Sequence, residues 1–416
     1  MPWNTCDREK AKKSFIEEWL SGGQPPLAWL CRRHGISRFC GYKWLRRFRE
    51  GGEAGLRERS RRPASAQRLC EIWLERLRAA HLREPEFGAK KLHWKLRRDH
   101  PRRRVPDVRT LARWLKALGK VRMRVRRAPA GPSVRVPGRL TARCANDVWS
   151  ADIKGSFCTG DGRQVLALTV RDLASRFVLC VRRLPQADEH HVGRVMRGLF
   201  RRYGLPRAIR CDNGAPFGGD GPRGWSRLSV QWVKLGIRPE YGRPRHPEDN
   251  PHHEQMHRVL KRDTAQPAAP NLRAQQRRFD RWREHYNQCR PHEALGMEVP
   301  AARYRPGRRE LPDKPPSHGY PSGWELLSPD RMGRCFWRGR QRRIGKAFVN
   351  ETLGGKPIGT QTLAVYFREH LIGTLHQNDL AGLRGVPRNA HQCKAGGAAP
   401  LPAPTPIDKR SASSKL

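Results

Sequence analysis

The stretch HPEDNPHHEQMHRVLKR, from His246 to Arg262, places a glutamate between two histidines at the spacing of metal ligands. His253, Glu254 and His257 form the pattern H-E-x-x-H, which on a helix sets two imidazoles on one face beside a carboxylate. Zinc proteases use that arrangement, with the glutamate as a base beside the metal. Glu254 could instead be the last carboxylate of a magnesium site that cuts DNA, since magnesium prefers hard oxygen ligands. The pattern alone leaves both chemistries open.

Two further carboxylates stand where a magnesium site needs them. Asp152 falls in a predicted strand, in a W-x-x-D pattern with Trp149, and Asp212 ends another predicted strand. A central strand, its neighbour and a covering helix can bring three carboxylates together. Two divalent ions held roughly 3.5–4 Å apart by such groups support in-line phosphoryl transfer. One acidic residue at a strand end is more often a cap or turn former, so the set of three carries the prediction.

The charge of the whole chain favours nucleic acid as its partner. The 416 residues include 85 Lys and Arg against 38 Asp and Glu, a formal net charge of +47. Such a chain repels itself unless a polyanion is nearby, and its affinity for nucleic acid should fall steeply with salt. An arginine-rich genome could explain part of this excess, but not a charge this large.

Cysteine usage and hydropathy indicate the compartment. Eleven cysteines are scattered without a C-x-x-C pair, and neither an apolar N-terminal segment nor an apolar run of 18 residues occurs. The sequence therefore predicts a reduced, cytosolic protein that is neither secreted nor membrane-spanning.

Residues 11–49 are predicted to form three helices, of which the last two make a helix-turn-helix around HGIS. The third helix begins at Ser37, a good N-cap, and turns Leu45 toward the core. A plain helical bundle with a solvated basic face is the alternative, and outward arginines beside aromatic residues favour DNA. Four basic side chains of this helix are expected to face outward and bind DNA: Arg38, Lys43, Arg46 and Arg47.

Periodicity and composition predict a multidomain chain whose parts change from helical to α/β to β. We expect a helix-turn-helix domain at 1–62, a second helical, winged-helix-like DNA-binding domain at 63–127, a linker at 128–145, an α/β catalytic core with a mixed sheet at 146–305, a linker at 306–323, a small β-barrel at 324–386 and a disordered tail at 387–416.

Several motifs, in order, resemble those of insertion-sequence transposases of the DDE superfamily, which also contains the retroviral integrases. W-x-x-D, RCDNGAPF, GRPRHPEDNPHHEQMHRVLKRD and YNQCRPHEAL resemble the integrase core, and GISRFCGYKWLRRFREGGEAGLRERSRRP resembles the N-terminal helix-turn-helix. The resemblance covers roughly residues 5–305. It implies an RNase H-like core, DNA cleavage and strand transfer with Mg²⁺ or Mn²⁺, and Asp152, Asp212 and Glu254 as the catalytic, metal-binding triad.

The same resemblance implies the partners and location. The partners are double-stranded DNA, as element ends and as target, and further copies of the chain in a homo-oligomer assembled on DNA. The location is the nucleoid of a bacterial cytoplasm, with no membrane. Arg258 and Lys261, on the helix of Glu254, are further expected DNA contacts.

Glu248 competes with Glu254 for the third position of the triad. It has 35 residues between it and Asp212, the spacing that many relatives use, whereas Glu254 has 41. Asn250 can cap the helix and Pro251 suits its first position, so Glu248 is expected in a loop outside it.

Glu254 is chosen because it falls within the helix. There it shares a face with Arg258 and Lys261, opposite an apolar stripe of Met256, Val259 and Leu260. In the family the glutamate also follows the Asn of the D-N pair by four residues, as Glu254 does. Pro251 stands where the family usually has glycine, and it could misaim Glu254 slightly.

Two other functions stay open at the level of sequence. A zinc protease would need a third ligand downstream, and His285 and His292 are present. More plausibly His253 and His257 are ordinary helix residues, with His257 near a phosphate. The other alternative is a helix-turn-helix regulator or transposase relic that has lost catalysis, against which the intact triad argues.

Overall fold

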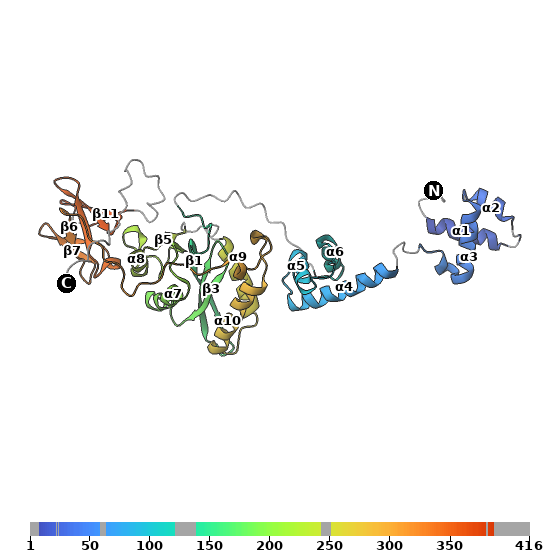
Figure 1. Ribbon diagram of the computed structural model, residues 1–416, viewed down its shortest axis with the longest axis horizontal. Helices are drawn as coiled ribbons and strands as arrows, with labels where there is room; N and C mark the ends of the chain where they lie inside the picture. The colour runs from blue at the N-terminus through green and yellow to red at the C-terminus, as the bar shows by residue number, and fades with distance from the viewer. Residues whose placement is uncertain are drawn as a thin grey trace, which may run out of the picture. The chain divides into compact units, whose positions relative to one another are not determined.

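The computed structural model describes residues 8–21, 23, 25–58, 64–120, 139–242, 251–379 and 382–386 (Figure 1). The chain divides into two compact units, Met1–Gly119 and Lys120–Leu416. Residues 121–138, which include the end of the predicted second helical domain and much of the predicted linker, and the predicted tail at 387–416 lie outside the described residues. Among the helices that are described, none has the length and hydropathy needed to cross a membrane.

The first unit begins with the three predicted helices. Phe15, Leu30 and Leu45 are buried in their shared core. The hydroxyl of Ser37 accepts a hydrogen bond from the backbone N–H of Cys40 at 3.2 Å, so the predicted N-cap is confirmed. The third helix runs farther than expected, through a glycine-rich stretch that bends at Gly52, where φ is 56°. The helices are α1 (Arg8–Leu20), α2 (Leu27–Arg33) and α3 (Arg38–Gly55).

A second group of three helices follows in the same unit. Its own apolar core contains Trp73, Leu77, Leu92 and Leu111. Residues 64–120 contain no strand, so no wing of a winged helix is seen among them. The helices are α4 (Ala64–Arg83), α5 (Ala89–Asp99) and α6 (Val108–Ala117).

The second unit is built on a five-stranded mixed sheet, as the sequence predicts. Its strand order is β3-β2-β1-β4-β5, in which β1 pairs antiparallel with β2 and parallel with β4. The central strand β1 therefore has a neighbour of each orientation. The strands are β1 (Val148–Cys158), β2 (Gln164–Asp172), β3 (Val178–Leu184), β4 (Ala208–Cys211) and β5 (Arg238–Tyr241).

Helices cover both faces of this sheet (Figure 1). Trp149 and Ala151 of β1 pack with α7 and α8 in one apolar cluster, whereas α9 and α10 pack on the opposite face. Because side chains alternate along a strand, Ser150 and Asp152 project toward α9 and α10. The covering helices are α7 (Glu189–Tyr203), α8 (Arg227–Lys234), α9 (Pro251–Ala265) and α10 (Leu272–Cys289).

The predicted apolar stripe fixes α9 on the sheet. Met256, Val259 and Leu260 are buried in one cluster with side chains of β2, β3 and α10. Burial of side chains this size stabilises the fold by about 1.5–3 kcal/mol each. The packing thereby sets which face of α9 looks outward.

Side chains of α10 complete the backbone hydrogen bonds of β3. The amide oxygen of Asn287 accepts from the N–H of Val178 at 2.8 Å, and its nitrogen donates to the carbonyl of Val178 at 2.9 Å. Gln276 contacts the backbone of Val181 and Arg183 in a similar way. The asparagine of YNQCRPHEAL thus has a clear structural role at the edge of the sheet.

The β-rich C-terminal part forms an open sheet, so the expected closed barrel is not confirmed. Five strands pair in the order β12-β11-β10-β9-β6, and β7 and β8 form a separate ribbon. The apolar face is covered by packing rather than by closure, since the ring centres of Phe348 and Phe367 lie 6.2 and 6.4 Å from that of Trp225, in the loop before α8. The strands are β6 (Glu325–Leu327), β7 (Arg334–Trp337), β8 (Arg340–Arg343), β9 (Leu353–Pro357), β10 (Thr362–Phe367), β11 (His370–His376) and β12 (Arg384–Gly385), and the short helices are η1 (Pro222–Gly224), η3 (Glu293–Leu295), α11 (Pro300–Arg303) and η4 (Lys346–Phe348).

Candidate active site

Asp152 and Asp212 occupy equivalent positions on neighbouring parallel strands. Ser150 of β1 is in register with Arg210 of β4, and each aspartate lies two residues farther along its strand direction. Residues in register on parallel strands project to the same face, and adjacent strands are about 4.8 Å apart. Asp152 lies within β1 and Asp212 directly follows β4, on the face that α9 covers.

The loop after Asp212 is held by a buried hydroxyl network. The hydroxyl of Ser229 donates to the carbonyl of Phe217 at 2.7 Å and lies 2.6 Å from the hydroxyl of Tyr241. Ser226 donates to the same carbonyl at 2.8 Å. These contacts tie the RCDNGAPF motif to α8 and β5, which restrains the backbone that carries Asp212.

Glu254 lies in the first turn of α9, with its side chain exposed. Arg258 and Lys261 are exposed on the same helix, as expected. The pKa of Asp212 is raised above its ordinary value, first by desolvation and second by the negative charge of Glu254. The two carboxylates are therefore close enough to repel one another.

The two histidines of H-E-x-x-H point the opposite way, into the protein. His253 and His257 are each 1% exposed, and both Nε2 atoms lie 2.7 Å from the hydroxyl oxygen of Thr169 on β2. His253 Nδ1 lies 2.9 Å from the hydroxyl of Ser150, and His257 Nδ1 lies 3.3 Å from Oδ2 of Asp152. This burial is inconsistent with the expectation that His257 contacts a phosphate.

The choice between Glu248 and Glu254 rests partly on residues that the structure does not describe. Glu248 and Asn250 lie outside the described residues, so the proposed cap and the placement of Glu248 stay predictions. Pro251 is the first residue of α9, the position expected for it.

The three predicted triad residues supply hard oxygen donors. Carboxylates on two adjacent strands and on the covering helix match the donors that Mg²⁺ and Mn²⁺ prefer. The repulsion between Asp212 and Glu254 has the sign that a bound cation relieves. By donor chemistry the residues therefore fit a divalent ion.

A second donor group overlaps this one. One ligand atom each of Asp152, His253 and His257 lie within 4.8 Å of one another. Its two imidazole donors would suit a softer transition metal. Both nitrogens of His253, however, already lie within hydrogen-bond distance of hydroxyl groups.

The basic side chains of α3 divide into two sets. Arg38, Lys43 and Arg46 are exposed, as predicted. Arg47 is only 8% exposed, which corrects the expectation that it faces DNA. Its Nη2 donates to the carbonyl of Arg57 at 2.7 Å, and its guanidinium lies 4.6 Å from the ring centre of Trp44. Arg47 is thus part of the packing of this helical group.

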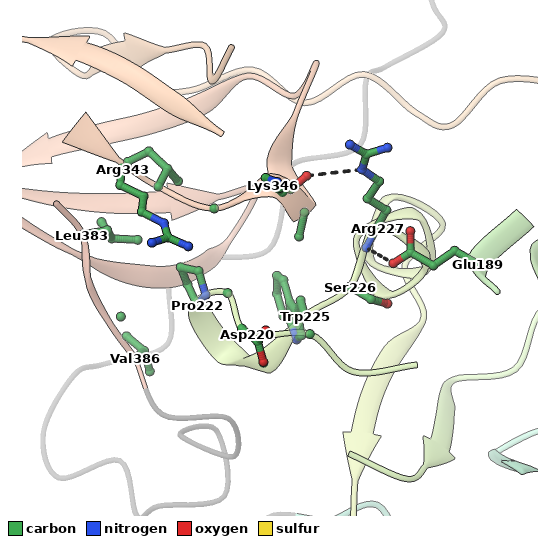
Figure 2. A pocket seen from close by; sticks show the side chains of 17 residues that line it. Glu189, Asp220, Pro222, Trp225, Ser226, Arg227, Arg343, Lys346, Leu383 and Val386 are labelled. Atoms are coloured by element: carbon green, nitrogen blue, oxygen red, sulfur yellow. Dashed lines mark hydrogen bonds between the residues drawn. The ribbon is translucent and has the colours of Figure 1, made fainter. Parts of the chain in front are cut away.

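A cleft of about 920 Å³ lies between the loop before α8 and the C-terminal sheet, and none of the three carboxylates lines it (Figure 2). The Glu189 carboxylate accepts from the backbone N–H of Arg227 at 3.1 Å, and Arg227 Nε donates to the carbonyl of Lys346 at 3.3 Å. These contacts link α7 and α8 to the C-terminal sheet.

Sequence comparisons match three segments of the chain to known families. Residues 142–247 and 235–300 match two models described as integrase core domain, and residues 11–64 match a helix-turn-helix domain. Over 299 residues the chain is 29% identical to an uncharacterized 39.2 kDa protein of insertion element IS476 from Xanthomonas euvesicatoria, covering 70% of this chain and 81% of that one.

Solved structures of retroviral proteins show weaker similarity. The HTLV-2 integrase catalytic core domain in complex with magnesium is 13% identical with a TM-score of 0.33, covering 40% of this chain and 100% of that one. The simian T-cell lymphotropic virus intasome in complex with the PP2A regulatory subunit B56 gamma is 14% identical with a TM-score of 0.35, covering 62% and 90%.

The two integrase-core matches, on a mixed sheet with helices on both faces, define a DDE polynucleotidyl transferase. The helix-turn-helix match and the insertion-element relative narrow this class. Together these matches support an insertion-sequence transposase of the DDE/integrase superfamily, with an integrase core of a divalent-metal-dependent kind and a helix-turn-helix that implies DNA binding. The zinc-protease interpretation of H-E-x-x-H is thereby set aside.

Two residues near Asp152 were not singled out from the sequence. Ser150 and Thr169 contact the histidines of α9, and Thr169 is the cross-strand partner of Asp152. Alternation places Ser150 on the face of Asp152. The i, i+4 spacing of His253 and His257 was the only sequence signal that polar partners were needed there.

Proposed function

We propose that Asp152, Asp212 and Glu254 form the catalytic, metal-binding triad of this transposase, with Mg²⁺ or Mn²⁺ as the working ion. The observation that carries the proposal is geometric: the parallel register of β1 and β4 sets Asp152 and Asp212 at equivalent positions on the sheet face that α9, the helix of Glu254, covers. The pKa of Asp212, raised first by desolvation and second by the charge of Glu254, supports the inclusion of Glu254. The parallel register of β1 and β4 supports the inclusion of Asp152.

A different structural element positions each of the three carboxylates. Asp152 is fixed by the central strand, Asp212 by the anchored loop after β4, and Glu254 by the buried stripe of α9. Divalent ions bound by these groups would supply activation of the attacking oxygen and stabilisation of the leaving oxygen. The carboxylates themselves provide negative charge at fixed points, which would hold the ions at set positions relative to the sheet.

The DNA is proposed to be bound by basic residues outside the triad. Arg38, Lys43 and Arg46 of α3 are exposed in a helix-turn-helix, whose second helix commonly enters the major groove. Arg258 and Lys261 lie near Glu254 and would contact phosphates of the strand being cut. We further propose that copies of the chain assemble on the element ends, as strand transfer of two ends requires.

The test uses the full-length protein with duplex DNA that carries the inverted repeats flanking its gene. Asp152→Asn should abolish cleavage and strand transfer in Mg²⁺ while leaving DNA affinity within about twofold, because the basic faces are unchanged. Retained cleavage by this variant would remove Asp152 from the triad. DNA binding without cleavage by the unmodified protein would instead indicate a silent relic.

A further inference from the structure

A buried row of polar side chains runs beneath the proposed triad and ends at Asp152. It links Ser150 and Asp152 of β1 with Thr169 of β2 and with His253 and His257 of α9. In order, the atom pairs are Ser150 Oγ to His253 Nδ1 at 2.9 Å, His253 Nε2 to Thr169 Oγ1 at 2.7 Å, Thr169 Oγ1 to His257 Nε2 at 2.7 Å, and His257 Nδ1 to Asp152 Oδ2 at 3.3 Å.

The acceptor of the single Thr169 hydroxyl hydrogen decides which atom donates and which accepts in each of these contacts. Besides the two imidazoles, the hydroxyl lies 3.1 Å from the carbonyl oxygen of Asp152. A neutral imidazole has one N–H donor and one acceptor nitrogen, so its two contacts must have opposite sense.

Of the three acceptors that could take the Thr169 hydrogen, only His257 Nε2 leaves a hydrogen on the His257 nitrogen that faces Asp152. If it goes to the Asp152 carbonyl or to His253, the Nε2 of His257 must donate, which leaves a nitrogen lone pair 3.3 Å from the Asp152 carboxylate. If it goes to His257 Nε2, then His257 Nδ1 carries the hydrogen that faces Asp152. His253 then donates to Thr169 and accepts from Ser150, and the Asp152 carbonyl oxygen receives no hydrogen from Thr169.

We propose that Ser150, His253, Thr169 and His257 form a hydrogen-bonded chain whose last member, with Nδ1 3.3 Å from Oδ2 of Asp152, holds the Asp152 carboxylate in the orientation that binds a divalent ion. The inference rests on the proposed function of Asp152 as a metal ligand. These four are positioning residues, since they act through Asp152. Groups that orient metal ligands commonly change metal affinity or activity by about 10–100-fold when they are replaced.

A transition-metal site made from Asp152, His253 and His257 is the competing interpretation of the same side chains. Such an ion would have to displace a hydroxyl from His253, because both of its nitrogens lie within 2.9 Å of one. The chain needs no ion to satisfy these contacts, so the two interpretations differ in the metal-free protein.

The first experiment reads the imidazole tautomers directly. The full-length protein, labelled with ¹⁵N-histidine and stripped of metal by a chelator, is examined by NMR, with H253Q and H257Q used to assign the signals. The chain predicts hydrogen on Nε2 of His253 and on Nδ1 of His257. A His257 ring with hydrogen on Nε2 and none on Nδ1 would overturn it. Stoichiometric zinc in the untreated protein, bound through both histidines, would favour the transition-metal site and also overturn it.

The second experiment interrupts the chain at its centre and measures ion binding without turnover. Thr169→Val keeps the side-chain shape and removes the hydroxyl, whereas Thr169→Ser keeps the hydroxyl and is the matched control. Thr169→Val should weaken Mn²⁺ binding, measured by electron paramagnetic resonance, by about tenfold or more. Thr169→Ser should stay within about twofold, and circular dichroism should show both variants folded.

The outcomes separate this inference from the proposed function. Unchanged Mn²⁺ affinity in folded Thr169→Val contradicts the chain while leaving the triad intact. Full strand transfer by Asp152→Asn contradicts the triad, whatever the tautomers are.

Discussion

At the scale of single residues, ionisation of Asp212 lowers the stability of the folded protein. Asp212 has a pKa above its ordinary value of 3.8 because desolvation and the charge of Glu254 disfavour its ionised form. A carboxyl group whose folded-state pKa is raised loses its proton at a higher pH in the folded chain than in the unfolded chain. Folding is therefore less favourable once pH has risen past the raised pKa. Such a conflict is expected where a site is arranged to bind a cation.

Asp212→Asn should therefore raise the melting temperature of the metal-free protein at neutral pH while abolishing strand transfer. The gain is small, on the order of a degree, because the carboxylate is exposed and partly screened. It should shrink as pH falls through the raised pKa and vanish below 3.8, where aspartate is protonated in both states. Thermal scans from neutral to acidic pH test this, and a variant less stable than the parent at neutral pH would show that Asp212 is not under repulsion.

At the scale of elements, α3 combines a DNA-facing row with a packed row. Arg46 is exposed, whereas Arg47 donates to the backbone of Arg57 and stacks near Trp44. A long arginine stem can be buried when its guanidinium finds an acceptor and an aromatic face. Of these two adjacent arginines, Arg46 is therefore available to DNA and Arg47 is part of the packing.

Replacing these arginines singly should separate DNA binding from stability. Arg46→Ala should weaken binding to the element ends with little change in unfolding free energy. Arg47→Ala should cost about 1.5–3 kcal/mol in unfolding free energy, since the carbonyl of Arg57 loses its charged hydrogen-bond donor. Denaturant melts and DNA titrations of the two variants test this. Equal effects of both variants on stability would contradict the assignment.

The sequence predicts elements better than it predicts which side chains meet between them. It places Asp152 in a strand, Asp212 at a strand end and Glu254 in a helix, because periodicity and caps are local signals. The burial of Arg47 could have been inferred, since it stands three residues after Trp44 on the same helix face. The contacts of Thr169 with α9 could not, because they depend on which helix covers that face of the sheet.

For the C-terminal sheet, the sequence likewise predicts the strands but not whether they close into a barrel. Short alternating runs separated by glycine are compatible with a closed barrel and with an open sheet. Which of them forms depends on what covers the apolar face. Here the ring of Trp225 packs near Phe348 and Phe367, and the buried Arg223 donates from Nε to the carbonyl of Leu371 at 2.7 Å.

At the scale of the whole molecule, charge governs the association with DNA. A formal net charge of +47 is distributed over both compact units. Release of counterions from DNA by this many cationic groups makes binding strongly dependent on salt.

Affinity for duplex DNA should therefore fall by about 10³–10⁵ between 50 and 200 mM salt if six to ten phosphates are contacted. Equilibrium titrations of the full-length protein with the element-end duplex, and with a scrambled duplex as control, measure the slope. Both duplexes should lose affinity in parallel, because phosphate contacts carry no sequence information. A nearly flat salt dependence would show that the excess charge is not used on DNA.

The most direct test of the central claim compares two glutamates in one strand-transfer assay. Glu254→Gln and Glu248→Gln are each incubated with the element-end duplex and a supercoiled plasmid in Mg²⁺. Glu254→Gln should lose at least about a hundredfold in strand transfer, since metal-held charge contributes several kcal/mol, while DNA binding persists. Glu248→Gln should retain strand transfer. Loss of activity in Glu248→Gln with activity kept in Glu254→Gln would contradict the proposed triad.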